Sequence, residues 1–457
     1  MTLAIYWKRL GSTRQRPSPG GALGVALMAL ALAGGVALPA SAAPMAAGQQ
    51  ALFSRMMADP GNVDLALKYA EASAQAGDLE GAVSTLERLL IFAPQVARLN
   101  YELGVLYYRL GAYAAASGYF TTAQSAADAS PEIKAQAATY LARATSASAP
   151  DRTSASIAIG ARYQTNANGG AGSSLVDLNG VPFQLNSAAM ADADSNAFVS
   201  GVVHATHDLA SQGDRFDIDL SFYGAPYLKH TEINTLAADL RAGPVFNLQR
   251  FAIPRSTLQL YGVVGGVALA GDPYDVSAGG GALLTTAVDP KTLAHVRLES
   301  RYEQFMDSAR RPNVSDMTGA RTRLSADLKH QATDWASFYG SVYGERKMAL
   351  AGDSADWEAG AALGGIFALN VPALGEQGHW SLDLSAGILQ RNFDANDPVI
   401  STNPRQDRQV YLQGSLTVPL APSWSAVGTV GYQRQLSTYD LYTYDNVSGS
   451  LAVVKGF

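Results

Sequence analysis

The second half of the chain alternates apolar and polar residues in stretches about as long as one bilayer crossing. In VYLQGSLTVPL, residues 410–420, apolar residues or glycine occupy the even positions, while tyrosine, glutamine, serine and threonine occupy the first four odd ones. WSLDLSAGI, residues 380–388, and FDIDLSF, residues 216–222, alternate in the same way. Because successive side chains of a strand point to opposite faces, each stretch has one apolar and one polar face. After residue 42 no run is long and apolar enough for a spanning helix, so membrane insertion requires strands that close into a barrel.

Fourteen such stretches predict one antiparallel transmembrane β-barrel over residues 149–457. Links such as SQG, VDPK, QATD and LAPS after even-numbered strands are short, and most links after odd-numbered strands, such as MDSARRPNVS, are longer. The fifth link is short and the tenth is long, against this rule. Short turns at one end and long loops at the other are typical of outer-membrane barrels. The predicted strands are residues 154–164, 196–209, 214–225, 233–246, 255–270, 274–286, 291–305, 316–330, 334–346, 356–369, 379–393, 405–420, 423–436 and 443–457.

Aromatic residues near the strand ends are typical of the girdles that outer-membrane barrels place at both membrane interfaces. The alternative fold is a soluble β-sandwich, which also alternates but needs many fewer residues. The predicted girdle residues are Tyr261, Tyr302, Tyr339, Tyr343, Trp357, Trp380, Trp424 and Tyr432.

The last stretch, NVSGSLAVVKGF, alternates up to Phe457. We expect it to pair with the first strand, because a barrel in lipid has no free edge. It resembles the C-terminal signal, alternating and ending in phenylalanine, by which outer-membrane barrels are recognised for assembly. Phe457 is therefore predicted to be read by the barrel assembly machinery. Lys455 departs from the apolar residue expected two positions before the end.

Charged residues fall on the parity opposite to the apolar face and are predicted to line the lumen, the space enclosed by the barrel. They cannot face lipid, where Arg or Lys at the midplane costs about 2–4 kcal/mol. Two interpretations stay open: a hydrated conduit, or a network of ion pairs that braces the wall. The loop at 165–194 is long enough to fold inward as a plug. The predicted lumen residues are Asp217, Asp219, Asp239, Arg241, Arg297, Glu299, Arg301, Arg321, Arg323, Asp327 and Lys329.

Residues 43–148 are rich in alanine and repeat with a period of 34 residues. Ala70 matches Gly104 and Leu86 matches Phe120, as Pro60 matches Pro94. Small residues where two helices cross, bulky residues beside them and proline at the end are the tetratricopeptide pattern. It predicts repeats at about 61–94 and 95–128 and a capping helix at 131–145. On the concave face we predict either a peptide groove or ordinary solvated and packed positions, formed by Asp64, Glu71, Arg98, Tyr101 and Tyr108.

The first 42 residues predict a cleaved export signal. A basic start precedes the apolar run GALGVALMALALAGGVAL at 21–38, and Ala40, Ser41 and Ala42 form a small-x-small cleavage site. A membrane anchor is the alternative, since the run approaches the length of a spanning helix. An export signal followed by a barrel predicts the outer membrane of a Gram-negative bacterium, with the helical domain in the periplasm.

Composition argues against other classes of function. Charged residues are 16 % of the chain and the net charge is -6, so no nucleic-acid partner is expected. The chain has no cysteine and six histidines, and His204 and His207 lie three apart on a strand, facing opposite sides. We therefore expect no enzyme, no metal and no cofactor.

The order of segments resembles the surface lipoprotein assembly modifier family of outer-membrane translocators. The likeness lies in RLNYELGVLYYRLGAYAAASGYFTTA, the capping helix, and IAIGARYQTNAN opening the barrel. It implies export of a protein client to the cell surface, with the helical domain engaging the client or a chaperone in the periplasm. The alternatives are an exopolysaccharide export porin and a periplasmic scaffold anchored by its barrel.

Overall fold

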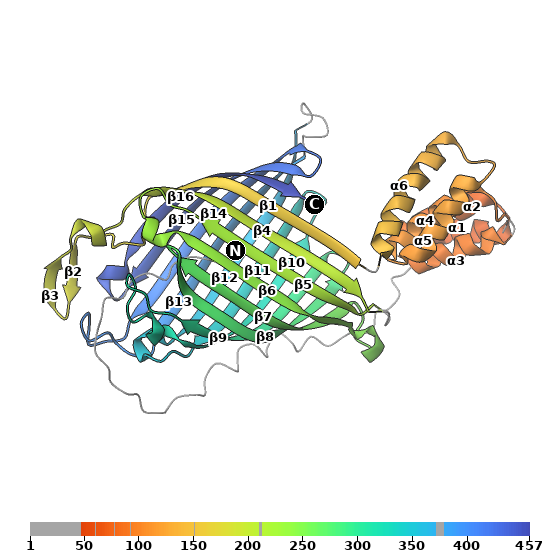
Figure 1. The fold of residues 1–457 in the computed structure, drawn as a ribbon. Coiled ribbons are helices and arrows are strands. Elements are labelled where there is room, and N and C mark those ends of the chain that lie inside the picture. The colour runs from red at the N-terminus through yellow and green to blue at the C-terminus, as the bar shows by residue number, and fades with distance from the viewer. Residues whose placement is uncertain are drawn as a thin grey trace. The chain divides into compact units, whose positions relative to one another are not determined.

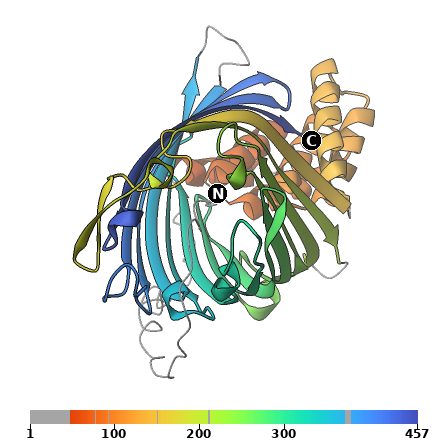
Figure 2. The same ribbon diagram turned by 60° about the vertical axis from the view of Figure 1, so that its left-hand side comes forward.

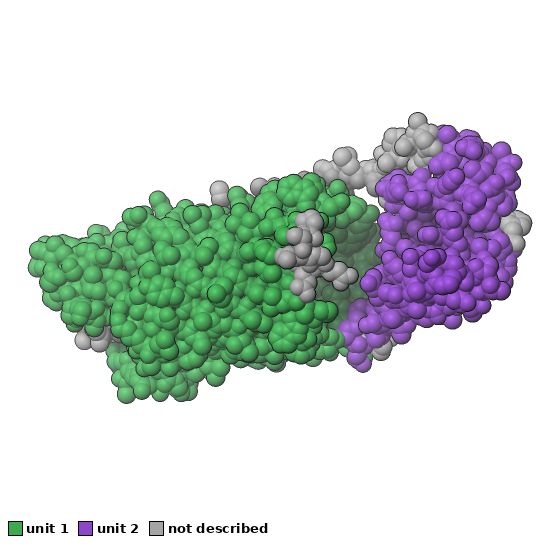
Figure 3. Space-filling model, turned by 90° about the horizontal axis from the view of Figure 1, so that it is seen from above, with its two compact units in different colours: residues 1–17, 153–457 green, residues 18–152 purple. Residues whose placement is uncertain are grey.

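The computed structural model describes residues 47–59, 61–76, 78–91, 93–149, 151–209, 213–371 and 379–457. These residues form two compact units that meet in the chain between Arg152 and Thr153 (Figures 1 and 3). The first unit is helical and the second is a closed barrel, which confirms the predicted fold class. The predicted export signal, residues 1–42, lies outside the described residues.

Six helices make up the described part of the first unit. Asn62, Asp78 and Ser130 begin three of them, because each side-chain oxygen accepts a hydrogen bond from the backbone N–H three residues later, at 3.1, 2.9 and 3.2 Å. No described helix is long and apolar enough to cross a bilayer. The helices are α1 (Ala47–Ala58), α2 (Val63–Gln75), α3 (Leu79–Leu90), α4 (Ala97–Arg109), α5 (Tyr113–Ser125) and α6 (Pro131–Ser148).

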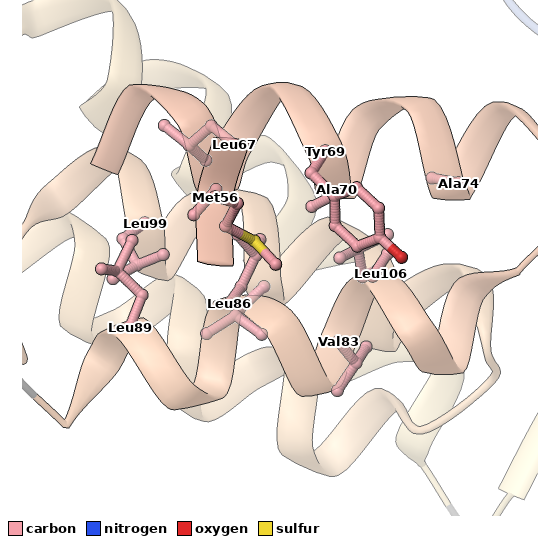
Figure 4. Packing of buried hydrophobic residues seen from close by; sticks show 13 residues of the cluster. Met56, Leu67, Tyr69, Ala70, Ala74, Val83, Leu86, Leu89, Leu99 and Leu106 are labelled. Atoms are coloured by element: carbon pink, nitrogen blue, oxygen red, sulfur yellow. The ribbon is translucent and has the colours of Figure 1, made fainter. Parts of the chain in front are cut away.

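The helices follow the predicted repeat. The pairs α2–α3 and α4–α5 fall within the two 34-residue segments, and α6 contains the predicted capping helix. The sequence reasoning gave α1 no place in a repeat, yet its Met56 is 1 % exposed in the core of the first repeat (Figure 4). An additional helix therefore covers the open end of α2 and α3.

The two repeats fill the same space with different pairs of residues. Ala70 and Leu86 lie buried in the cluster of the first repeat (Figure 4). The corresponding residues of the second repeat are Gly104 and Phe120, and a Cβ atom on Gly104 would lie 2.5 Å from Cε1 of Phe120. The larger ring requires the smaller partner, which is the physical reason for the match at positions 70/104 and 86/120.

The second unit is a closed antiparallel barrel of fourteen strands (Figures 1 and 2). Strands that are neighbours in the chain are neighbours in the sheet, and β16 pairs with β1 to close the ring. All fourteen predicted strands are present, with ends shifted by a few residues. They are β1 (Asp151–Gln164), β4 (Asp194–Asp208), β5 (Arg215–Ala225), β6 (Thr235–Asn247), β7 (Ser256–Leu269), β8 (Asp272–Asp289), β9 (Thr292–Phe305), β10 (Gly319–Gln331), β11 (Ala336–Lys347), β12 (Asp356–Asn370), β13 (His379–Phe393), β14 (Gln406–Ala421), β15 (Trp424–Ser437) and β16 (Tyr444–Gly456).

The closing ladder extends to Phe457. The N–H of Phe457 donates to the carbonyl oxygen of Ala155 at 2.9 Å, and its ring is 70 % exposed. The ammonium group of Lys455 lies 5.0 Å from the ring centre of Trp424 and 5.6 Å from that of Phe457, and it donates to Ser423 Oγ at 2.7 Å. Cation–π contacts with two rings thus accommodate the lysine on a face where an apolar residue was expected.

The two rims of the barrel differ in the length of their connections. We call the rim where β1 begins and β16 ends the short-turn rim; its tightest links include residues 290–291. The opposite, long-loop rim carries residues 165–193 and 306–318. The predicted exception at this rim is present: Ala270 and Gly271, with φ of 53° and 86°, form a two-residue turn of the kind that antiparallel hairpins favour.

The outer face of the barrel is apolar and exposed. Leu363, Leu451 and Val430 are 72, 74 and 67 % exposed. Soluble proteins rarely expose a continuous apolar band, whereas a lipid-facing barrel requires one. The ring is closed and its outer band is apolar, so the β-sandwich alternative is wrong.

Part of the predicted aromatic girdle does not face lipid. Tyr302 and Trp357 are 55 and 41 % exposed on the outer parity of their strands, whereas Tyr261, Tyr339 and Tyr343 point into the lumen and donate hydrogen bonds to carboxylates. The prediction for these three tyrosines was wrong, because parity within the strand decides the face. The outer parity also holds Trp380, Trp424 and Tyr432.

Two glycine-to-alanine substitutions in the second repeat test the packing at Gly104. Gly104→Ala is expected to destabilise the helical unit by about 1–3 kcal/mol, because the new methyl group overlaps the Phe120 ring. Gly118→Ala, on α5 with no atom within 4 Å of its added Cβ, is expected to stabilise it by about 0.5–1 kcal/mol through helix propensity. Circular dichroism at 222 nm during urea unfolding measures both. Equal effects would show that the Gly104–Phe120 contact is unimportant.

Candidate functional site in the lumen and on the helical unit

Alternation along β9 separates the faces of the barrel wall. Val296 and Leu298 are 42 and 50 % exposed on the outer face. Arg297, which lies between them in sequence, and Glu299 have the opposite parity. Arg241 Nε on β6 lies 3.1 Å from Glu299 Oε2, although β7 and β8 separate the two strands. Such a contact is possible only across the concave inner side, so this parity faces the lumen.

The first group of lumenal charges joins β6 and β9. Arg241 forms an ion pair with Asp239 at 2.9 Å and donates to Glu299 at 3.1 Å, and Arg301 donates to Glu299 at 2.7 Å and also pairs with Asp239. Tyr261 donates to Glu299 at 2.8 Å. Two cations and two anions alternate within one network, so the group is neutral and most of its hydrogen-bonding capacity is used within the protein.

The second group joins β9, β10 and β11. Arg321 Nε lies 2.7 Å from Glu303, and the same guanidinium pairs with Glu345. Arg323 lies 3.4 Å from Glu345, and Lys347 Nζ lies 3.9 Å from Glu303. This group pairs three cations with two carboxylates across neighbouring strands.

The network continues onto strands where sequence reasoning named no lumen residue. Arg391 on β13 donates to Glu358 on β12 at 2.7 Å and lies 3.8 Å from Asp356, while Arg405 lies 2.6 Å from Asp407. These residues could have been predicted from the same alternation that was used on β9 and β10, since each shares the inward parity of its strand. Ion pairs therefore run along the lumen wall from β6 to β14.

The remaining predicted lumen residues lie outside these groups. Asp217 is 4 % exposed and accepts from Thr206 Oγ1 at 2.7 Å, and Asp219 lies 2.7 Å from His204 Nδ1. Arg297 stacks over the Tyr261 ring at 6.0 Å. On the inward parity of β10, toward the short-turn rim, two further predicted residues are exposed: Asp327 and Lys329.

Tyrosines in the lumen lie against the wall because glycines face them. Tyr343 on β11 is the direct cross-strand partner of Gly360, and a Cβ on that glycine would lie 2.4 Å from the ring. Tyr343 then donates to Glu358 at 2.5 Å. The aromatic ring is held flat and its hydroxyl is occupied, so it takes little space from the lumen. A tyrosine ring lies over a glycine in the same way at three further pairs: Tyr261 with Gly281, Tyr339 with Gly364 and Tyr411 with Gly387.

Burial changes along the lumen axis. Near the long-loop rim the inward side chains Lys347, Asp407 and Tyr444 are 0, 1 and 3 % exposed. Farther from that rim Val202 on β4 is 52 % exposed and Gln413 on β14 is exposed. The lumen is therefore crowded by side chains toward the long loops and open at Val202 and Gln413. Toward the short turns it is open along β10, whereas Asp217 on β5 and Val245 on β6 are 4 and 2 % exposed. Crowded and open regions coexist, which combines the two interpretations left open by the sequence.

The loop at 165–193 does not fill the lumen as a plug. It forms a hairpin of β2 (Leu175–Leu178) and β3 (Val181–Gln184) that stands beyond the long-loop rim (Figure 1). The N–H of Asn179 at its tip donates to the carbonyl oxygen of Ile400 at 3.0 Å. The hairpin is thus fixed to the neighbouring loop.

A polar pocket of about 470 Å³ lies between this hairpin and the loop at 394–405. The side chain of Asn179 donates to the carbonyl oxygen of Pro398 and that of Asn396 to the carbonyl oxygen of Ser401, both at 2.8 Å. These amides hold the loops together, and we assign no ligand to the pocket.

The predicted concave residues of the helical unit have different surroundings. Asp64, Glu71 and Arg98 are exposed. Tyr101 and Tyr108 are half-buried, with ring centres 6.0 and 5.7 Å from that of Tyr140 on α6. The two tyrosines therefore hold α6 against α4 and leave one side of the aromatic cluster accessible.

Acidic groups dominate the electrostatics of this surface. Burial raises the pKa of the Glu102 carboxyl; Arg98 opposes this shift and Glu71 adds to it. Burial likewise raises the pKa of Tyr101. A carboxyl group whose pKa is raised by burial and by a like charge gains from a cation brought close to it. The surface formed by Glu71, Arg98, Tyr101, Glu102 and Tyr108 is therefore suited to a segment that carries basic residues.

No family model matches the chain, and neither does any curated protein sequence. Among solved structures, the helical unit is similar to PcrH in complex with the chaperone binding region of PopD, at 20 % identity over 21 % of this chain and 75 % of that chain, with a TM-score of 0.20. The barrel is similar to the outer membrane channel DcaP of Acinetobacter baumannii, at 10 % identity over 67 % of this chain and 97 % of that chain, with a TM-score of 0.38. It is also similar to a bacterial polysaccharide outer membrane secretin, at 10 % identity over 66 % and 98 % of the two chains, with a TM-score of 0.34. These likenesses are distant, and we draw no functional conclusion from them.

Two valine-to-cysteine substitutions test whether the lumen is hollow, in a chain that has no other cysteine. Val202 and Val245 both face inward, at 52 and 2 % exposed. We expect a water-soluble maleimide to label the Val202→Cys barrel much faster than the Val245→Cys barrel, followed by mass spectrometry. Similar slow rates would show that the lumen is filled at the level of Val202.

A charge deletion tests the ion pairs. Arg321→Gln leaves the carboxylates of Glu303 and Glu345 with less compensation, and we expect a loss of about 3–5 kcal/mol of barrel stability. Arg297→Gln, which removes a lumenal guanidinium stacked on Tyr261, is the matched control and is expected to cost less. The guanidinium chloride midpoint, read from heat-modifiable migration of the folded barrel, measures both. An equal loss would argue that the pairing of Arg321 contributes nothing special.

Proposed function

We propose that the chain is an outer-membrane translocator that exports an extended protein client to the cell surface after its helical unit has bound that client in the periplasm. The observation that carries the proposal is a lumen whose ion-paired wall carries balanced charges overall and which opens, at Val202 and Gln413 and along β10, toward the short-turn rim. The helical unit is joined to this same rim, since α6 ends at Ser148 and β1 begins at Asp151.

The orientation follows from the two rims. Short turns of outer-membrane barrels face the periplasm and long loops face outward. The short-turn rim, and with it the helical unit, then lies on the periplasmic side. This placement gives the client-binding surface access to proteins that have just crossed the inner membrane.

The width of the lumen limits the client. Barrels of eight strands are filled by their side chains, and those of sixteen to eighteen strands leave an aqueous channel. With fourteen strands, the barrel falls between these two classes, and ion pairs crowd its long-loop end. We therefore expect the lumen to admit an extended chain and to exclude a folded domain. A wall whose paired charges balance overall suits a heterogeneous polypeptide, because it neither traps nor repels one sign of charge.

Polysaccharide export is the second candidate, because four tyrosine rings lie flat over glycines along the lumen wall, and sugar conduits favour aromatic tracks. However, Arg323 lies over the Tyr343 ring at 3.6 Å and Arg297 over the Tyr261 ring at 6.0 Å. Guanidinium groups thus occupy two of the four ring faces that a sugar would need. The aromatic track is interrupted, which favours the protein client.

A barrel-anchored scaffold is the third candidate, favoured by the crowded long-loop end. In this case the lumen would carry nothing. We assign no catalytic step and no cofactor to either unit.

Deletion of residues 47–148 is expected to abolish export while the barrel still inserts. The measurement is protease shaving of intact cells, with comparison of the released surface peptides. One or a few surface proteins should be lost. If polysaccharide in the medium falls and the surface proteins persist, the second candidate is correct; if neither changes, the scaffold is favoured.

Two charge reversals test the recruiting surface. Glu71→Lys on α2 is expected to reduce surface delivery of the client severalfold, because it repels a basic segment. Glu80→Lys, an exposed reversal on α3 outside the predicted face, is the matched control and should export normally. Equal export by both variants would contradict the proposed recruiting surface.

A further inference from the structure

Three arginines lie on the outer, lipid-facing side of the barrel near the long-loop rim. Arg346 on β11 is the cross-strand partner of the exposed Trp357, and Arg408 on β14 is the partner of the exposed Leu436. Arg434 on β15 shares the parity of Leu436. Each arginine is within four residues of its strand end at that rim. They therefore lie at the level of the membrane interface, above the hydrocarbon.

The cluster is confined to one side of the barrel. The outward residues near the same rim on the other side include no charged side chain among those of the described strands β6 to β10: Leu236, Ala268, Val276, Tyr302 and Ala320. An interface on that side needs only apolar and aromatic contacts. On the side from β11 to β16, the three arginines allow an additional contact with an anion.

The three guanidinium groups are not fully matched by carboxylates. Arg346 Nη1 donates to Asp394 Oδ1 at 2.6 Å, and Arg434 Nε lies 3.8 Å from Asp445, whose carboxylate also accepts from a tyrosine. Arg408 Nε donates at 3.3 Å to the neutral amide oxygen of Gln390. Three cations thus share two carboxylates, and the excess positive charge belongs to Arg408 between the other two.

We propose that Arg408 and Arg434, which are diagonal neighbours on β14 and β15, bind a phosphate group of a phosphorylated glycolipid in the outer leaflet, and that Arg346, separated from Arg408 by β12 and β13, adds positive charge to the same interface. An arginine fork matches phosphate oxygens with two parallel hydrogen bonds, and the low dielectric beside the hydrocarbon strengthens them. The amide oxygen of Gln390 accepts from Arg408 and its nitrogen donates one N–H to Asn392 at 3.0 Å, which leaves its second N–H for the phosphate. Trp357 beside Arg346 is 41 % exposed and provides the aromatic contact typical of membrane interfaces.

The proposal rests on the orientation given above, in which the long-loop rim faces outward, but not on the identity of the client. Lipid binding by the purified chain is measured without any export. Failure of the lipid site would therefore leave the translocation assay unaffected, and failure of translocation would leave the binding assay unaffected.

The test is native mass spectrometry of the full chain in detergent, titrated with diphosphoryl lipid A, with enzymatically dephosphorylated lipid A and with inorganic phosphate. The unmodified chain is expected to retain diphosphoryl lipid A preferentially. Arg408→Gln should bind it about tenfold more weakly, the usual consequence of losing one charged hydrogen-bonding group. Arg408→Lys, which keeps the charge and loses the fork, should be intermediate.

Lys455→Gln is the matched control, because Lys455 is an outward cation at the opposite, short-turn rim. It should bind diphosphoryl lipid A as the unmodified chain does. Equal binding by Arg408→Gln, or equal retention of the dephosphorylated lipid, would overturn the proposal. Binding of inorganic phosphate as tight as that of the lipid would also overturn it, because the site would then recognise a free anion.

Discussion

The pairing of β1 with β16 is the interaction on which the rest of the barrel depends. In hydrocarbon, an unpaired backbone N–H or C=O costs several kcal/mol, so a sheet with two free edges cannot persist there. Once the ladder between residues 156–164 and 448–456 closes the ring, every strand has two neighbours. Along the whole circumference, alternation then divides the side chains of each strand between lipid and lumen. The apolar set of each strand faces the lipid.

Charge placement follows from the same closure. An arginine on the lipid face at the midplane would cost about 2–4 kcal/mol, whereas the inner face offers partners on strands that are distant along the wall but near across the lumen. Arg241 and Glu299 make such a contact over two intervening strands. The pairs stiffen the wall at the long-loop end, and the flat tyrosines over glycines leave the rest of the interior unobstructed. The ion pairs that brace the wall and the hydrated space thus lie at different levels of the same lumen.

The periods of the hydrophobic pattern predicted the architecture because they reflect the local geometry of strands and helices. A period of two gave all fourteen strands, and the 34-residue repeat gave the helix pairs, including the small residue at Gly104. The partners of the charges could not be predicted, since the contact of Arg391 with Glu358 depends on register. The prediction that Tyr261, Tyr339 and Tyr343 belong to the aromatic girdle was wrong, because it rested on residue type and took no account of parity within the strand. The role of Tyr101 and Tyr108 in holding α6 depends on Tyr140, more than thirty residues away in the chain.

The link between the two units has a kinetic consequence. The chain passes from Ser148 to Asp151 through two residues, and a fully extended chain spans at most about 3.3–3.6 Å per residue. Under the proposed function, a client segment bound to the helical unit would be tethered to the barrel by this link, at an effective concentration in the millimolar range expected for a short tether. A binding site with a dissociation constant of this order would be sufficient for occupancy. Weak, rapidly reversible contacts would then hold a client and release it without an energy source.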